Sequence, residues 1–127
     1  MFETIRTAAF MAKAFLDARG PIRKGKTLPP EEKWRLGYEF VHGRSAEIFK
    51  TAGCRVIYHG LENIPERTGI LFVGNHQSYL DIPAILAVME DPTAFVSKSS
   101  VGRKPFLGPI LEMIGCVSIE REDLRQA

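Results

Sequence analysis

The sequence predicts an α/β chain in which an N-terminal helical hairpin precedes alternating strands and helices. Apolar residues recur at helical spacing over residues 1–53, whereas short β-type runs alternate with helical segments from Cys54 onward, a pattern typical of a parallel, right-handed sheet. The 127 residues are 45% hydrophobic and 25% charged, which fits one globular domain and excludes a disordered chain or a disulfide-stapled miniprotein.

The hairpin is predicted from two helical segments. The first is expected over residues 2–17 and is expected to end at Gly20-Pro21, because proline disfavours helical geometry in the preceding residue. The second is expected from Glu31 to Thr51, with Gly53 as its C-terminal cap. A basic linker joins them, with Arg23, Lys24 and Lys26. Two interpretations stay open: the helices pack on the rest of the chain, or an apolar face docks on an anionic membrane surface.

The net charge of +2 is unevenly distributed. Residues 1–55 hold 11 Lys and Arg against 6 Asp and Glu, whereas residues 56–127 hold 6 against 9. The basic front end favours an anionic partner, with a solvated basic surface as the alternative. Nucleic acid is disfavoured, because the basic residues are not interleaved with stacking aromatics. The longest run without a charged residue, residues 68–80, has 13 residues, whereas a bilayer crossing needs about 20.

The second part of the chain predicts short strands separated by helices. Residues 69–74 are nearly continuously apolar, as expected of a buried parallel strand. Helices are expected from Ser78 to Met89 and from Pro105 to Ile114. The other strands are expected at residues 55–58, 93–97 and 116–119. Cys54 and Cys116 lie too far apart in sequence for a metal-type pair, so buried, reduced thiols and no metal site are expected.

A polar cluster, Asn75 to Asp81, directly follows the apolar run 69–74. Sites in α/β sheets gather at the carboxyl ends of strands, and His76 can act there as a general base whose tautomer Asp81 fixes. The pair can meet if His76 lies in a loop and the helix starts at Ser78, because helical side chains tilt toward the N-terminus. Ser78 and Asp81 also form a capping-box pattern that needs no catalysis, and the two interpretations are compatible.

The motif Asn75-His76-x-x-x-x-Asp81 resembles the first motif of the glycerolipid acyltransferases, which include the 1-acyl-sn-glycerol-3-phosphate (lysophosphatidic acid) acyltransferases. The resemblance continues in order and at matching spacing over residues 55–127. Its further motifs are a strand ending in lysine, a proline-phenylalanine-x-glycine stretch and a glycine-strand-arginine motif, at Phe95–Lys98, Pro105–Gly108 and Gly115–Arg121. The chain departs from the family at Glu120, where aspartate is commoner, and at Ser99–Val101.

The resemblance implies transfer of a fatty acyl group from an acyl carrier protein or coenzyme A thioester to the free hydroxyl of 1-acylglycerol-3-phosphate, giving phosphatidic acid. His76 would be the general base and Asp81 would orient it. Arg121 and Lys98 would bind the acceptor phosphate, although a solvated Lys98 and an ion pair of Arg121 with Glu120 or Glu122 are the alternatives. The resemblance implies no cofactor and no metal. It also implies a peripheral enzyme on the cytoplasmic face of the cell membrane, seated through its N-terminal helices and without a spanning helix.

Two rival functions stay open from the sequence. One is acylation of another lysophospholipid or of glycerol-3-phosphate, and the other is a non-catalytic membrane-binding or partner-binding module. The family's third motif, glutamate-glycine-threonine-arginine, and its fourth motif do not occur in the 127 residues. Residues 54–127 are therefore expected to be the N-terminal half of a catalytic domain within a longer enzyme. A sheet cut after its first strands leaves an unpaired edge, which predicts marginal stability and weak activity for this chain alone.

Overall fold

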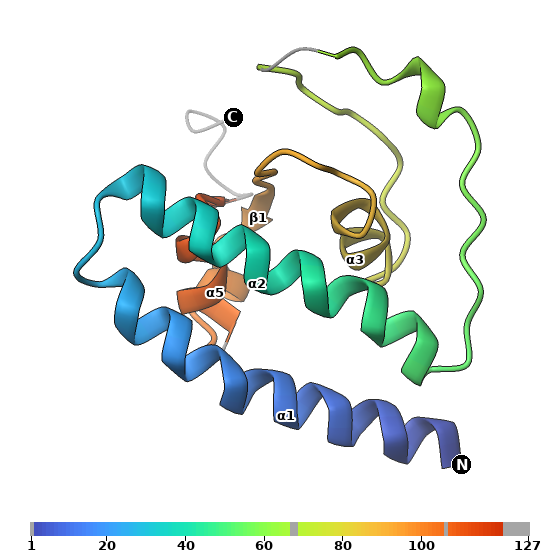
Figure 1. Cartoon of the computed structure of the whole chain (residues 1–127), viewed down its shortest axis with the longest axis horizontal. Coiled ribbons are helices and arrows are strands. Elements are labelled where there is room, and N and C mark those ends of the chain that lie inside the picture. The colour runs from blue at the N-terminus through green and yellow to red at the C-terminus, as the bar shows by residue number, and fades with distance from the viewer. Residues whose placement is uncertain (1, 67–68, 106, 121–127) are drawn as a thin grey trace.

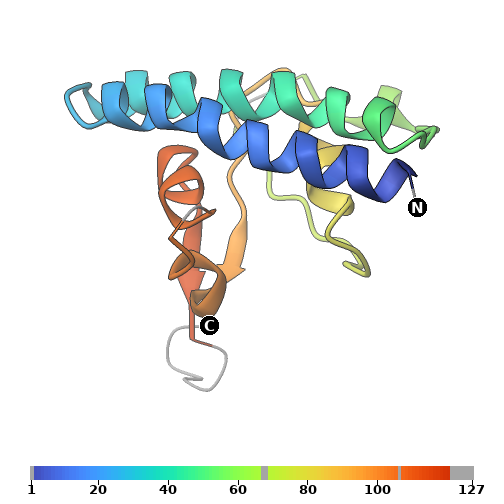
Figure 2. The ribbon, with the colours of Figure 1, turned by 90° about the horizontal axis from the view of Figure 1, so that it is seen from below.

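A layer of two long antiparallel helices forms one side of the molecule, and the shorter elements lie on the other side of that layer (Figures 1 and 2). The computed structural model describes residues 2–66, 69–105 and 107–120, without the side chains of residues 2–4 and 7. Helix α1 spans Phe2–Gly25 and α2 spans Pro30–Thr51, and they pack side by side along most of their length. The predicted helical hairpin is therefore present.

Helix α1 does not end at Gly20-Pro21 as expected, because it continues through both residues to Gly25. An internal proline removes one helical hydrogen bond and costs about 3 kcal/mol. Packing on both sides of it offsets that cost: Ala18 is fully buried, and the Cα of Gly25 lies against the Met113 side chain. Arg23 and Lys24 of the expected basic linker accordingly lie in the last helical turn, where positive charge complements the helix dipole, and Lys26 follows the helix.

Helix α2 has the expected bounds because its signals are local. A proline occupies its first position, where the missing N–H leaves no helical bond unmade. At its end Gly53 adopts a positive φ of 68°, its N–H donates to the Lys50 carbonyl, and the N–H of Cys54 donates to the Phe49 carbonyl at 2.9 Å. This is a Schellman motif, which confirms Gly53 as the cap.

The core lies between the helical layer and the two short helices beneath it, α3 (Asp81–Leu86) and α5 (Leu107–Met113). A Cβ on Gly37 of α2 would come within 2.9 Å of the Met113 carbonyl oxygen, so glycine permits α5 to approach α2 closely. Met113 itself is 2% exposed. The buried apolar residues are Ala18, Tyr38, Phe49, Leu86, Ile110, Met113 and Ile114.

Strands β1 (Val96–Lys98) and β2 (Val117–Ile119) form a two-stranded parallel sheet. In the register Val96 pairs with Val117 and Lys98 pairs with Ile119. The connection between them runs through α4 (Ser99–Gly102) and α5, so the predicted strand–helix–strand unit is present and the mixed architecture agrees with the α/β class. The helix expected over 105–114 is shorter than predicted, and α4 was not anticipated.

The two remaining strand predictions are wrong for this chain. Residues 54–60 and 69–77 are extended but belong to no sheet, and the 3-10 helix η1 (Leu61–Asn63) follows the first of them (Figure 1). Leu71 is 83% and Val73 is 88% exposed, the opposite of a buried strand. A strand needs a neighbour for its backbone hydrogen bonds, and within the described residues the only strands pair with each other.

Candidate active site

The side chains of His76 and Asp81 meet, with Nδ1 of the imidazole 3.0 Å from Oδ2 of the carboxylate. His76 lies in the extended segment before α3, as the spacing required. The helix itself begins at Asp81 and ends at Leu86, so the expected bounds of Ser78 and Met89 are wrong. The late start has a local cause, because Pro83 has no N–H with which to bond the carbonyl four residues earlier.

The Asp81 carboxylate also closes the turn that precedes α3. Its Oδ2 accepts hydrogen bonds from the backbone N–H groups of Gln77 at 2.9 Å and Ser78 at 3.0 Å, and the Ser78 hydroxyl accepts one from the N–H of Leu80 at 3.2 Å. Of the two reciprocal bonds of a capping box, only the bond from the Ser78 N–H to Asp81 is present. The Ser78 hydroxyl bonds Leu80, and Leu80, the residue before α3, makes no side-chain cap bond. The prediction that Ser78 caps the helix is therefore wrong, whereas the predicted contact of His76 with Asp81 is present.

The electrostatics of this turn keep Asp81 ionised. The N–H groups of Ser78 and Gln77, and then the His76 ring, hold the pKa of the Asp81 carboxyl below its usual range. An ionised carboxylate only accepts hydrogen bonds, so Nδ1 of His76 carries the proton when the two bond. In the neutral ring Nε2 is then the nitrogen that can accept a proton. The His76 side chain is 56% exposed, which leaves the ring accessible.

Two tyrosine hydroxyls hold the helix that begins with Asp81. Tyr58 donates to the Ala84 carbonyl at 2.9 Å, and Tyr38 of α2 donates to the Met89 carbonyl just beyond the helix end. The last carbonyls of a helix have no partner inside it, and the N–H of Val88 bonds Ile85 rather than Ala84. Tyr58 therefore acts as a side-chain cap of α3, and Tyr38 holds the chain that follows it. Sequence reasoning missed them, because neither lies near α3 in the chain.

The other predicted residues lie at the ends of β1 and β2. Lys98 is the exposed last residue of β1, and Glu120 directly follows β2. Arg103 Nη1 lies 2.7 Å from Glu120 Oε1, so the two side chains form an ion pair at the end of β2. Arg121, the second predicted phosphate ligand, lies outside the described residues. The Ser99 hydroxyl and then Arg103 lower the pKa of the Glu120 carboxyl.

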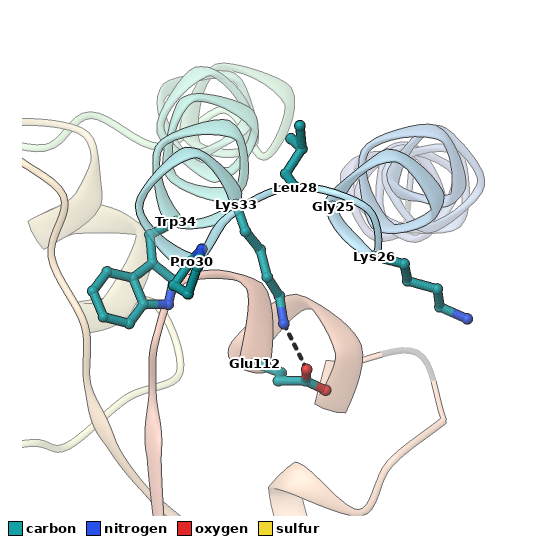
Figure 3. A pocket seen from close by; sticks show the side chains of 7 residues that line it. All are labelled: Gly25, Lys26, Leu28, Pro30, Lys33, Trp34 and Glu112. Atoms are coloured by element: carbon teal, nitrogen blue, oxygen red, sulfur yellow. Dashed lines mark hydrogen bonds and ion pairs between the residues drawn. The ribbon is translucent and has the colours of Figure 1, made fainter.

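The cysteines and the cavities lie apart from this chemistry. Burial raises the pKa of the Cys116 thiol, whereas Cys54 is exposed rather than buried as expected. No cluster of three potential metal ligands occurs in the part of the chain that the structure describes. Figure 3 shows a cavity of about 370 Å³ beside Trp34, bordered by the 2.6 Å ion pair of Lys33 with Glu112. A second cavity of about 580 Å³ lies along the basic end of α1.

A family model described as acyltransferase matches residues 55–127, which is more than half of the chain and includes both groups of site residues. The chain belongs to the acyltransferase family. The match begins where the helical hairpin ends, so the part of the acyltransferase domain seen here includes α3, the parallel strand pair and the connection between the strands.

Curated relatives agree with this assignment. The chain is 30% identical over 76 residues to a 1-acyl-sn-glycerol-3-phosphate acyltransferase of Borreliella burgdorferi, covering 60% of this chain and 30% of that one. It is 36% identical over 72 residues to a chloroplastic acyltransferase of the same name from Arabidopsis thaliana, covering 56% and 20%. It is 32% identical over 104 residues to a probable one from Mycoplasma pneumoniae, covering 77% and 36%. The matches thus span about a third or less of these relatives.

Two further findings concern matching solved structures and membrane-spanning helices. No solved structure gives a significant match to the chain. Among the helices that the structure describes, none combines the length and apolar character needed to cross a bilayer.

Proposed function

We propose that this chain carries the acid–base residues of a 1-acylglycerol-3-phosphate acyltransferase, with His76 as the general base and Asp81 as the residue that orients it. The observation that carries the proposal is the 3.0 Å contact between His76 Nδ1 and Asp81 Oδ2 within the region that matches the acyltransferase family. The names of the relatives support acyl transfer in phospholipid synthesis. The acyl donor is a thioester of acyl carrier protein or of coenzyme A, and the product is phosphatidic acid.

The proposed acyl transfer uses Nε2 of His76, the ring nitrogen that does not contact Asp81. Nε2 of His76 takes the proton from the acceptor hydroxyl as its oxygen attacks the thioester carbonyl, forming the C–O bond. The C–S bond then breaks, and the thiolate takes the proton back from the imidazolium. Asp81 fixes the tautomer and stabilises the imidazolium, as the aspartate of a Ser-His-Asp triad does. A thioester is already activated, so positioning and one base suffice and no acyl-enzyme forms.

The same proposal assigns the acceptor phosphate to Lys98 and Arg121. Lysine offers a point charge at the end of β1, and arginine offers a planar fork matched to phosphate oxygens. The helical layer of α1 and α2 is proposed to rest on the membrane that holds the lipid substrates. Exposed cations at the end of α1, including Arg19, Arg23 and Lys24, suit the anionic headgroups of the cytoplasmic leaflet.

A different lysophospholipid is the second candidate acceptor. The observation in its favour is a relative named as a lysophospholipid acyltransferase in Arabidopsis thaliana, 45% identical over 58 residues. That match covers 46% of this chain and 14% of the relative. Release of free thiol, measured across a panel of acceptors that differ in headgroup, separates the two candidates.

Replacing His76 tests the chemistry directly. In the full-length protein His76→Ala is expected to lower the rate of thiol release by roughly 10²–10⁴-fold, and Asp81→Asn is expected to lower it less. His59→Ala is the matched control, because His59 is exposed and lies outside the proposed site. Full activity in His76→Ala would refute the assignment. Liposome binding without thiol release by the wild type would favour a non-catalytic module.

A further inference from the structure

The strand ends form a polar cluster separate from the His76–Asp81 pair. β1 and β2 run parallel with Lys98 opposite Ile119, so Lys98 and Glu120 lie at the same edge of the sheet. Arg103, which follows α4, reaches this edge and pairs with Glu120 through Nη1 and Oε1 at 2.7 Å. This edge of the sheet therefore carries two cations, Lys98 and Arg103, and one carboxylate, Glu120. Lys98 is the proposed phosphate ligand.

The backbone that carries Arg103 is held against β2 by close approaches. A Cβ on Gly102 would come within 2.6 Å of the Ser118 hydroxyl oxygen, and a Cβ on Gly108 would overlap with the Gly102 carbonyl oxygen. The N–H of Gly108 also donates to the Lys104 carbonyl at 2.8 Å. The end of α4 is therefore packed against β2, and the fold itself brings Arg103 to Glu120.

Glu120 carries a negative charge beside a cation that an anionic substrate needs. The Ser99 hydroxyl and Arg103 keep the Glu120 carboxyl ionised by lowering its pKa, and the charge of Lys98 acts in the same direction more weakly. Glu120 thus attracts Lys98 as well as Arg103. A phosphate that approaches Lys98 must compete with Glu120 for the lysine charge, and the Glu120 carboxylate also repels it directly.

We propose that Arg103 is a positioning residue, which holds Glu120 so that Lys98 can bind the phosphate of the acceptor. The inference rests on the proposed transfer to a phosphate-bearing acceptor. A purely stabilising role does not account for the pair, because the two side chains are 68% and 47% exposed, and exposed ion pairs contribute little to stability. Loss of Arg103 is therefore expected to affect acceptor recognition and to leave the fold intact.

The test compares two acceptors that differ by the phosphate. In the full-length protein, Arg103→Ala is expected to raise the KM for 1-acylglycerol-3-phosphate roughly fivefold, with kcat and the KM for monoacylglycerol unchanged. Adding Glu120→Gln to Arg103→Ala is expected to restore the KM, because the negative charge beside Lys98 is then gone. Arg103→Lys is expected to lie between the two, since lysine supplies the charge without the planar fork.

Lys104→Ala is the matched control, because it removes the same charge from the adjacent exposed position. Its KM for the phosphate-bearing acceptor is expected to stay at the wild-type value. An equal rise in Lys104→Ala would show a general effect of basic charge and would overturn the proposal. An unchanged KM in Arg103→Ala, or no recovery on adding Glu120→Gln, would also overturn it.

A binding measurement separates this inference from the proposed function. Glycerol 3-phosphate serves as the probe, and its equilibrium binding is followed by NMR in the same variants. Weaker binding in Arg103→Ala with recovery in the double variant would support the positioning role even if the wild type transfers no acyl group. Acyl transfer that depends on His76 but not on Arg103 would support the proposed function and reject the positioning role.

Discussion

The helical layer and the segment that follows it differ in what covers their apolar residues. In the layer α1 and α2 pack against each other and against α5, and side chains such as Tyr38 and Phe49 are buried. Residues 69–74 are more apolar than either long helix, yet most of them are exposed, with Val73 at 88%. A helix satisfies its backbone internally, whereas a strand needs another strand. Apolar content alone therefore does not decide whether a segment is packed, because the more apolar segment is the uncovered one.

Truncation of one apolar side chain in each region should reveal the difference most strongly. Met113→Ala removes a side chain that is 2% exposed beneath the helical layer, and it is expected to lower the free energy of unfolding by about 2–5 kcal/mol. Val73→Ala, at an exposed position, is expected to change it by less than about 0.5 kcal/mol. Urea unfolding followed by circular dichroism measures both. A large loss in Val73→Ala would mean that residues 69–74 are covered in solution.

The contact between the segment that follows α2 and helix α3 can be weakened by removing one hydroxyl. Tyr58→Phe removes the donor to the Ala84 carbonyl and is expected to cost about 1 kcal/mol of stability. Tyr79→Phe is the matched control, because Tyr79 is 89% exposed and lies in the turn before α3. Hydrogen exchange at the amides of α3 is expected to accelerate only in Tyr58→Phe. Equal exchange in both variants would show that the tyrosine does not hold the helix.

The smallest expected effect is the pH dependence contributed by Asp81. The folded-state pKa of this carboxyl is lowered, chiefly by the Ser78 and Gln77 N–H groups. Its stabilising contribution is therefore present above the unfolded pKa of about 3.9 and is lost as the pH falls through the lower folded value. Asp81→Asn is expected to flatten this acid loss in unfolding curves between pH 7 and pH 2. If Asp81→Asn lost stability at low pH as the wild type does, the proposed contribution of the Asp81 hydrogen bonds would be wrong.

Local signals in the sequence predicted local structure well. The proline at the start of α2 and Gly53 at its end fixed that helix to within a residue. The sequence also indicated that His76 and Asp81 could meet, and they do, although through a turn before α3 and not through a helix that begins at Ser78. In each of these cases the interacting groups lie within a few positions of each other along the chain.

Interactions between distant segments could not be predicted in this way. Helix α1 continues past Gly20-Pro21 because its last turns pack against α5, some 90 positions later in the chain. The Arg103–Glu120 and Tyr58–Ala84 contacts join residues 17 and 26 positions apart, and no periodicity marks them. Residues 69–74 have the composition of a strand, but composition does not indicate whether a neighbouring strand is present.

The close approach of Gly108 to Gly102 has a practical consequence for protein engineering. Because Gly108 packs directly against the Gly102 carbonyl, a tag or linker inserted between these glycines is expected to separate Arg103 from the end of β2. The exposed turn of η1, which makes only local hydrogen bonds, is a better point for labelling or for splitting the gene. A reporter inserted at η1 leaves both polar groups of the acyltransferase undisturbed.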